Sequence, residues 1–403
     1  MKIVDLCEFY STRGGGVRSY LTRMGESVER HGHELVVIAP GPRDETRTQP
    51  GGKVITYAAP PMPYDPTYHW PLRVDRMREL VARERPDVLQ VSSPFVPAWV
   101  ARTLDAPLRT YVHHSDPIGC YLTPLASRHL PTALQATALA PAWAYLRSVS
   151  KSMDATITAG AWLTQQLSNH GCERVVTVPF GIAHDSFAPE KRDDALRARL
   201  LGSLAGDPNA KLLLITGRLA VDKRQDRLVD AAIRLSRKFP VALLVLGDGP
   251  ERANLERQAS VLPQATFLPF LHDRTQYAGL LASVDLLLHG SVCETFGFVI
   301  AETLLSGTPA VVPNAGAAPH MVAPGCAEVY AADADATTIA GAAERMLTLP
   351  RADVRTAALA TAKRHPTMDQ HFERLLGLYG RLAESPRVSR GGRIRAEFVP
   401  SIA

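Results

Sequence analysis

Two glutamates, Glu294 and Glu302, stand eight residues apart on either side of the start of an expected helix. That helix should run from about Gly297 to Ser306, between two short apolar strands. The Thr-Phe-Gly turn before it leaves the first-turn N–H groups available, and a helix start attracts anions. This segment therefore offers amide donors for a phosphate, one carboxylate just ahead of them and a second carboxylate two turns further on.

This arrangement suits a nucleotide-linked sugar, with the phosphate at the helix start, the sugar hydroxyls at one acid and the ribose hydroxyls at the other. The alternative is an ordinary strand–helix–strand unit whose two glutamates are solvated. Two acids alone do not separate these interpretations, because short motifs produce false matches.

Two cations, Arg218 and Lys223, bracket the loop after an expected strand at 211–215. Fixed cations can neutralise the charge that develops on a leaving diphosphate, the task that Mg²⁺ performs in other enzymes. The tripeptide Asp333-Ala-Asp335 matches a pattern of metal-dependent transferases, but it lies in an alanine-rich connector and is interpreted as chance. We expect no metal and no other cofactor.

In the stretch 108–116, a short strand delivers His113, His114 and Asp116 to its carboxyl end, where open α/β sheets bind ligands. Successive side chains of a strand alternate faces, so only one histidine should point toward a ligand. The first strand is followed by Gly14-Gly15-Gly16, which allows a close backbone approach but lacks the dinucleotide-binding spacing. A tight turn that binds no ligand is the alternative for these glycines.

The run from Ser291 to Val311, Ser-x-x-Glu-x-Phe-Gly-x4-Glu-x4-Gly-x-Pro-x-Val, resembles the E-x7-E signature of retaining glycosyltransferases of family four, which have the GT-B fold. The segment Gly-Arg-Leu-x-x-x-Lys that ends at Lys223 resembles the phosphate-binding segment of that family. Arg224 departs from the family, which usually has glycine there. The order Tyr-x-x-His-Ser-Asp around His114 resembles the catalytic-loop segment, and the resemblance covers residues 1–385.

The resemblance implies a role for each matching residue. Glu294 would grip sugar hydroxyls, Glu302 would hold the ribose, and His114 would bond the donor sugar near the reacting carbon. Lys223 and Arg218 would stabilise the departing diphosphate together with the amides of the helix start. The donor-binding positions that it implies are Gly15, Gly16, Phe296, Gly297, Phe298, Glu302, Phe270 and Leu271.

The length of 403 residues suits two domains. We expect an α/β protein of GT-B type, with two doubly wound parallel-sheet, Rossmann-like domains facing a central cleft. The N-terminal, acceptor-side domain should span 1–183 and the nucleotide-sugar domain 184–365. A helix at 366–385 should cross back to the first domain, and a basic tail should follow at 386–403.

Composition excludes several classes of protein. Hydrophobic content of 46% and charged content of 21% describe a globular chain with a sizeable core. No apolar run reaches the roughly 18 residues of a membrane helix. The start of the chain reads as a strand and not as a signal peptide, and five scattered cysteines without C-x-x-C spacing indicate reduced thiols. We expect a cytoplasmic protein that binds no nucleic acid, because no basic run is interleaved with aromatics.

The net charge of +5 lies mainly in the N-terminal half and in the tail, where it could meet an anionic acceptor or the inner face of a membrane. The segment 119–150, rich in Ala, Leu and Trp, could rest on a membrane surface or form an ordinary core helix, and the sequence favours the core helix. Residues 40–72 are expected to form a long loop with one strand at Lys53–Tyr57.

These features predict a retaining, metal-independent hexosyltransferase. It would move a sugar from a nucleoside-diphosphate sugar to an acceptor hydroxyl of a glycan, glycolipid or lipid-linked acceptor. A nucleotide-sugar epimerase, a phosphorylase of the same fold and a non-catalytic nucleotide-sugar-binding protein are the alternatives. The sugar, the base, the acceptor and the oligomeric state stay open.

Overall fold

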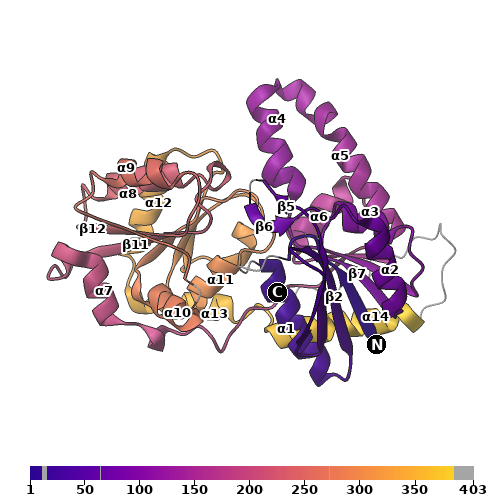
Figure 1. The fold of residues 1–403 in the computed structure, drawn as a ribbon. Coiled ribbons are helices and arrows are strands. Elements are labelled where there is room, and N and C mark those ends of the chain that lie inside the picture. Colours follow the sequence, from indigo (N-terminus) through magenta and orange to yellow (C-terminus); the bar gives the residue numbers. More distant parts are fainter. Residues whose placement is uncertain (11–15, 64, 272, 385–403) are drawn as a thin grey trace. The chain divides into compact units, whose positions relative to one another are not determined.

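The computed structural model describes residues 1–10, 16–63, 65–271 and 273–384. The chain divides into two compact units. The first comprises residues 1–118 and 125–181 together with the chain from Met368 onward, and the second comprises 119–124 and 182–367. Both units are α/β, as predicted, and each is described by itself (Figure 1).

The first unit is built on an eight-stranded sheet of order β10-β9-β8-β7-β1-β2-β4-β3, parallel except for the antiparallel edge strand β3. Its strands are β1 (Lys2–Leu6), β2 (Glu34–Gly41), β3 (Glu45–Gln49), β4 (Gly52–Ala58), β7 (Val88–Val91), β8 (Leu108–His113), β9 (Ala155–Thr158) and β10 (Val175–Thr177). A separate two-stranded ribbon joins β5 (Pro61–Met62) and β6 (Asp65–His69). The expectation of one strand within residues 40–72 was therefore wrong, because β3 and this ribbon lie there too.

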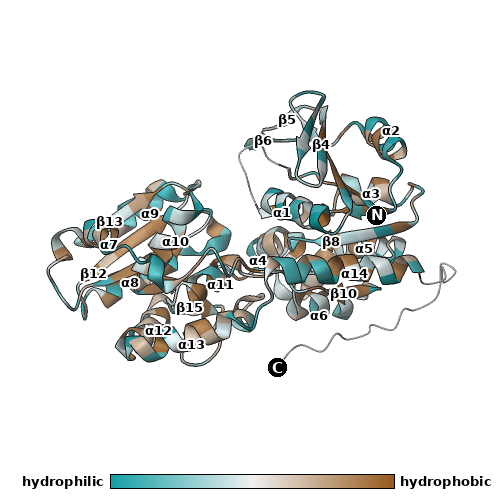
Figure 2. Ribbon diagram, turned by 90° about the horizontal axis from the view of Figure 1, so that it is seen from below, coloured by the Kyte–Doolittle hydropathy of each residue, from teal (hydrophilic) through white to brown (hydrophobic). Residues whose placement is uncertain are grey.

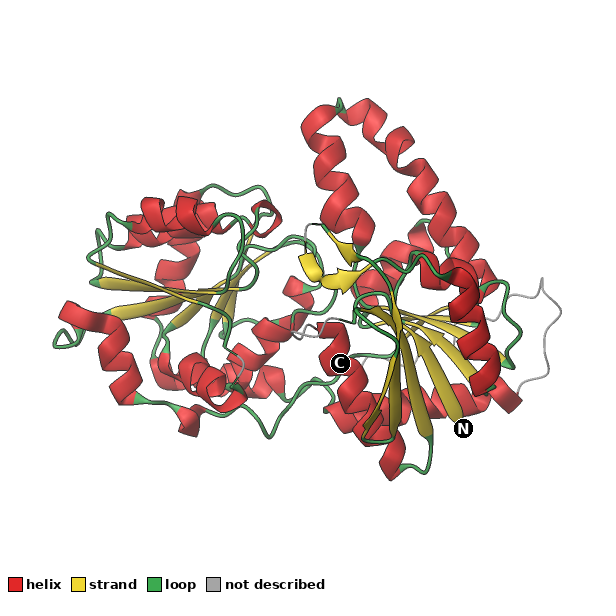
Figure 3. Ribbon diagram, viewed as in Figure 1, coloured by secondary structure: helices red, strands yellow, loops and turns green. Residues whose placement is uncertain are grey.

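Helices surround this sheet, as Figure 3 shows. They are α1 (Gly16–Arg30), α2 (Val74–Glu84), α3 (Val96–Ala101), α4 (Thr123–His129), α5 (Thr132–Ser152), α6 (Ala161–Asn169) and α14 (Met368–Glu384). Parallel strands that are covered on both faces read as continuous apolar runs. This explains why β1 and β2 are buried along almost their whole length. The same holds for β12 (Val241–Leu246) in the second unit, which is labelled in Figure 2.

The final helix, α14, is bonded to the middle of the first sheet. The Tyr379 hydroxyl on α14 donates to Gln90 Oε1 on β7 at 2.5 Å, and Gln90 Nε2 donates to Asp5 Oδ2 on β1 at 2.6 Å. Ser92 Oγ donates to the same Asp5 oxygen at 2.7 Å. Burial raises the pKa of Asp5 to about 7 even though these donors lower it. Buried polar groups of this kind need hydrogen-bond partners. The hydrogen bonds between Tyr379, Gln90 and Asp5 therefore hold α14 against the first sheet.

The interpretation of residues 119–150 as core helices was wrong. Of α4, only Ala126 is buried, and of α5 only Leu146, Val149 and Ser150 are buried. The two helices form a hairpin whose far part is covered by no other element of the described chain (Figure 1). Composition could not decide this point, because the same alanine- and leucine-rich sequence fits either environment.

The second unit contains a six-stranded parallel sheet of order β13-β12-β11-β14-β15-β16. Its strands are β11 (Lys211–Thr216), β12 (Val241–Leu246), β13 (Gln264–Leu268), β14 (Leu286–Leu288), β15 (Ala310–Pro313) and β16 (Ala327–Tyr330). Its helices are α7 (Asp194–Leu201), α8 (Gln225–Leu235), α9 (Arg252–Ala259), α10 (Arg274–Ser283), α11 (Phe298–Leu305), α12 (Ala336–Thr348) and α13 (Arg351–Ala362). The chain first forms β11, β12 and β13 toward one edge of the sheet. It then returns to the other side of β11 and forms β14, β15 and β16 toward the opposite edge.

Candidate active site

The centre of the second sheet places two of the predicted residues together. Strands β11 and β14 are parallel neighbours, with Leu213 opposite Leu286. The strand order reverses between them, and ligands of open α/β sheets bind at such a switch point, beyond the carboxyl ends of the strands. The loop after β11 carries Lys223, and the loop after β14 carries Glu294. Topology thus brings together two residues that lie 71 positions apart.

The contacts of Lys223 define this site. Its Nζ donates to Glu294 Oε1 at 3.0 Å and to Ser291 Oγ at 2.9 Å. His289 Nε2 lies 3.7 Å from the same Glu294 oxygen. A Cβ on Gly290 would stand 2.5 Å from the Lys223 carbonyl oxygen, so only glycine allows the two loops to lie this close.

The electrostatics of the pair favour a fixed, ionised state. Burial alone would raise the pKa of Glu294, but the charge of Lys223, the nearby His289 and hydrogen bonds lower it to about 2. Burial would lower the pKa of Lys223, yet Glu294 raises it above its ordinary value. Burial lowers the pKa of His289, so that its ring is neutral near pH 7. The site therefore holds a cation and a carboxylate that both stay charged under ordinary conditions.

This shift predicts a pH-dependent contribution to stability. The pKa of Glu294 falls from 4.5 to about 2 on folding, so its stabilisation is complete above pH 4.5 and is lost as the pH falls toward 2. Between pH 5 and pH 3, the free energy of unfolding of the wild type should fall by about 2 kcal/mol more than that of Glu294→Gln. Urea titrations of both proteins at the two pH values measure the difference. Equal losses in both proteins would contradict the assignment.

The main chain of Glu294 is held from a second loop. Ala317 N donates to the Glu294 carbonyl oxygen at 2.8 Å. Its neighbour Gly316 has a φ of 62°, and a Cβ there would stand 2.8 Å from the same oxygen. The backbone that carries the Glu294 carboxylate is therefore held in place by the neighbouring loop. A group that orients a ligand needs such a fixed position.

Helix α11 begins directly after this carboxylate, at the place expected. Gly297 precedes it with a left-handed φ of 94°, which favours glycine, and no side chain caps the helix start. The Phe296 ring is buried and the Phe298 ring is 37% exposed, with their centroids 4.8 Å apart. The helix dipole therefore points its positive end at the side of the loop that carries Glu294.

Glu302 lies inside α11 and is buried, and its role toward a ribose stays a prediction. Arg274 Nη2 donates to Glu302 Oε1 at 3.1 Å, and the Arg274 guanidinium stacks 4.9 Å from the Phe187 ring centroid. Sequence analysis did not identify Arg274, which lies 28 residues before its partner. It equally assigned no role to Ser291 or His289, although both stand just after β14, where ligands of such sheets are expected.

The remaining predicted residues of the second unit lie on other loops. Arg218 is 54% exposed and donates to Asp222 Oδ1 at 3.1 Å, so its charge is already shared with a carboxylate. Arg224 adopts a left-handed φ of 51°, the conformation for which glycine is the usual choice. An arginine therefore adopts here a backbone conformation that glycine takes more easily. Phe270, 65% exposed, and Leu271 follow the edge strand β13.

His114 and Gly16 belong to the first unit. His114 Nε2 lies 3.2 Å from Ser92 Oγ, and its ring packs on Tyr20 with centroids 4.7 Å apart. Burial, with smaller effects of neighbouring histidines, lowers the pKa of His114 to about 3. The adjacent His113 is buried in the core, and burial lowers its pKa to about 4. Gly16 begins α1, whereas Gly15 lies outside the described residues. The roles of these residues stay predictions.

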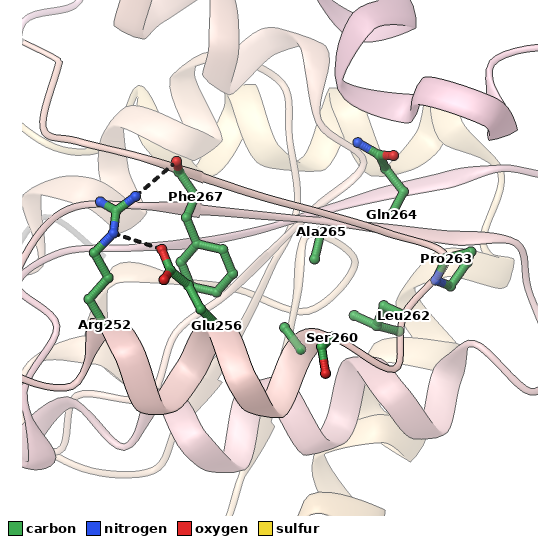
Figure 4. Close-up of a pocket in the computed structure, with 9 residues that line it drawn as sticks. Arg252, Glu256, Ser260, Leu262, Pro263, Gln264, Ala265 and Phe267 are labelled. Atoms are coloured by element: carbon green, nitrogen blue, oxygen red, sulfur yellow. Dashed lines mark hydrogen bonds and ion pairs between the residues drawn. The ribbon is translucent and has the colours of Figure 1, made fainter.

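A hollow of about 520 Å³ between α9 and the edge strand β13 contains none of the predicted residues. As Figure 4 shows, Arg252 extends along it toward Glu256 and the backbone of Phe267. Its guanidinium also donates to Asp248 at 2.8 Å. The cation is engaged by three acceptors, so we assign this hollow no function.

Comparison with known proteins identifies the family of the chain. The family model described as Glycosyltransferase Family 4 matches residues 14–186, and that described as Glycosyl transferases group 1 matches residues 210–349. A GDP-mannose-dependent alpha-(1-6)-phosphatidylinositol dimannoside mannosyltransferase of Mycobacterium tuberculosis is 31% identical over 325 residues. That match covers 80% of this chain and 82% of the relative.

Solved structures show the same fold. Sucrose-phosphate synthase from Thermosynechococcus elongatus superimposes with a TM-score of 0.75 at 17% identity, covering 95% of this chain and 99% of that one. The Anabaena protein HepE, solved in complex with UDP and glucose, gives a TM-score of 0.68 at 18% identity, covering 94% and 99%. The predicted GT-B fold is confirmed by these likenesses. Together with the family models and the mycobacterial relative, they show that the chain belongs to glycosyltransferase family 4.

Proposed function

We propose that this glycosyltransferase moves a mannosyl residue from GDP-mannose to a hydroxyl of a glycolipid acceptor, with retention at the anomeric carbon and without a metal ion. The mycobacterial relative is named for GDP-mannose and for a phosphatidylinositol mannoside, which supports this donor and this class of acceptor. The observation that carries the proposal is the ion pair between Lys223 and Glu294 at the switch point of the second sheet.

In this proposal the donor diphosphate lies against Lys223 and the start of α11. The ammonium, which keeps its proton because of Glu294, and the helix dipole both favour the negative charge that leaves with GDP. Glu294, ionised and fixed through its main chain, accepts hydrogen bonds from sugar hydroxyls. Arg218 supplies the second cation when its contact with Asp222 opens.

Glu302 holds the ribose hydroxyls, and Arg274 fixes the direction of its carboxylate. His114 acts through a hydrogen bond to the donor sugar, because a ring with a pKa near 3 is neutral at pH 7 and does not serve as a general acid. The leaving phosphate acts as the base for the acceptor on the same face of the sugar. Asp335 of the D-x-D tripeptide caps α12 by accepting from Thr338 N at 2.8 Å, a local structural role.

The test is transfer of labelled mannose from GDP-mannose to mycobacterial lipid extract in the presence of EDTA, with UDP-glucose as the competing donor. We expect a mannosylated lipid with an α-anomeric link to form equally well with and without the chelator. Loss of transfer in EDTA and its return with manganese would contradict metal independence, and a β-linked product would contradict retention. A nucleotide-linked sugar of changed configuration, without a lipid product, would favour the epimerase.

No helix among the described residues combines the length and the apolar character needed to cross a membrane. Separately, we propose that the protein works in the cytoplasm at the inner face of the membrane, because the acceptor proposed above is a lipid, which is reached at the surface of a bilayer.

A further inference from the structure

The helical hairpin formed by α4 and α5 leaves apolar side chains in solvent. Leu125 on α4 is 57% exposed and Leu134 on α5 is 53% exposed. A small number of exposed apolar residues is normal on any protein, but these two leucines lie on two consecutive helices of one hairpin.

The hairpin also lacks the charges that an exposed helix needs in water. From Thr132 to Leu146, α5 carries no charged residue of either sign, although most of these positions are exposed or only partly covered. A helix that faces water normally presents a charged or polar face to the solvent, whereas a helix that is apolar on all sides is buried in protein or in lipid. The part of α5 from Leu139 to Leu146 packs partly on the first unit, but the turns before it are buried in neither within the described chain.

The base of the hairpin is fixed. Leu146 packs in a cluster with Ile118, Leu163 and Leu167, and the Tyr145 hydroxyl donates to the Pro94 carbonyl oxygen at 2.7 Å. The last turns of α5 therefore belong to the core of the first unit, while the earlier turns project from it (Figure 1). A rigid base with an apolar projecting end is suited to docking on another surface.

The charge of the hairpin indicates which kind of partner surface it would bind. Between Asp116 and Asp154 the chain has no acidic residue, while Arg128, Arg147 and Lys151 are basic. A second copy of the chain would bring the same basic charges together, which opposes self-association through this face. Leucines beside basic residues are what a helix at an anionic lipid interface presents.

We propose that the α4–α5 hairpin docks the protein on an anionic phospholipid bilayer, with its leucines in the headgroup region and Arg128 at the lipid phosphates. The inference goes beyond the proposed transfer reaction, because it concerns a surface that carries none of the residues assigned to the donor. Binding to vesicles without acceptor tests it, whereas binding of GDP tests the donor site, so the two can fail separately.

The experiment is cosedimentation of the full chain with two kinds of vesicle. One contains phosphatidylcholine alone, and the other also contains about 30% phosphatidylglycerol, which makes its surface negative. We expect binding only to the anionic vesicles, and weaker binding in high salt. Leu125→Ser/Leu134→Ser should lower the partition coefficient roughly tenfold, and Arg128→Ser about fivefold. Circular dichroism checks that each variant is folded.

The matched control is Leu72→Ser/Leu349→Ser, which makes the same change at two exposed leucines outside the hairpin. A second control replaces the four arginines of the tail, Arg387, Arg390, Arg393 and Arg395, with serine. Binding that falls equally in the hairpin variant and the leucine control would overturn the proposal. Binding that is lost only in the tail variant, or a wild type that does not bind, would also overturn it. The same holds if sedimentation shows a wild-type dimer that dissociates in the hairpin variant.

Discussion

Replacing Lys223 with alanine should lower kcat for sugar transfer about a thousandfold, the loss seen when a charge-stabilising group of a transition state is removed. The Nζ of Lys223 is the cation that contacts Glu294 at 3.0 Å and Ser291 at 2.9 Å. Without it the charge of the leaving GDP has only the helix start and Arg218 to stabilise it. Release of GDP from GDP-mannose in the presence of acceptor measures the loss.

Lys238→Ala is the matched control for this variant. Lys238 also pairs with a glutamate, Glu344, at 2.6 Å, but that pair lies on an exposed face. The kcat of Lys238→Ala should equal that of the wild type, because surface ion pairs contribute at most about 1 kcal/mol to stability. Since Lys223→Ala also leaves Glu294 without its cation, the double variant Lys223→Ala/Glu294→Gln should recover stability without recovering activity. Activity that returns with stability would show that Lys223 has only a structural role.

Replacing Glu294 with glutamine should lower kcat/KM for the donor about a hundredfold. A neutral amide accepts weaker hydrogen bonds from sugar hydroxyls than an ionised carboxylate does, and it no longer fixes the Lys223 ammonium. The shape of the side chain is kept, so the loss is one of charge. Steady-state kinetics with GDP-mannose as the varied substrate provide the measurement.

Glu344→Gln serves as its control, because it removes the same charge from the exposed pair with Lys238. If Glu294 acts on the sugar and not on the nucleotide, the affinity for free GDP should change much less than kcat/KM. An equal loss of both would place Glu294 at the nucleotide, and wild-type kinetics in Glu294→Gln would remove it from the site.

The sequence was sufficient to predict the parts of the site that follow from local pattern. The strand before each loop and the helix after Gly297 lie where apolar runs and the Thr-Phe-Gly turn placed them. The meeting of Lys223 with Glu294 also follows from the rule that parallel strands put their carboxyl ends at one edge. The conformation of Arg224 could not be read in this way, since nothing local indicates that an arginine adopts a left-handed φ.

Other features depend on contacts between distant parts of the chain. Arg274 reaches Glu302 because α10 and α11 pack together, and no spacing rule links the two residues. The hairpin gave the clearest error. Its alanines and leucines fit a buried helix, and only the absence of covering elements shows that residues such as Leu125 and Leu134 are exposed.

The central claim is that Lys223 and the helix start at Gly297, without a divalent ion, bind the charge of the departing diphosphate. Isothermal titration of GDP into the protein in EDTA tests it most directly. The account predicts that GDP binds the wild type under these conditions and that Lys223→Ala weakens the affinity at least tenfold, while Lys238→Ala leaves it unchanged. Binding that requires added manganese or magnesium, or an affinity that Lys223→Ala does not alter, would contradict it.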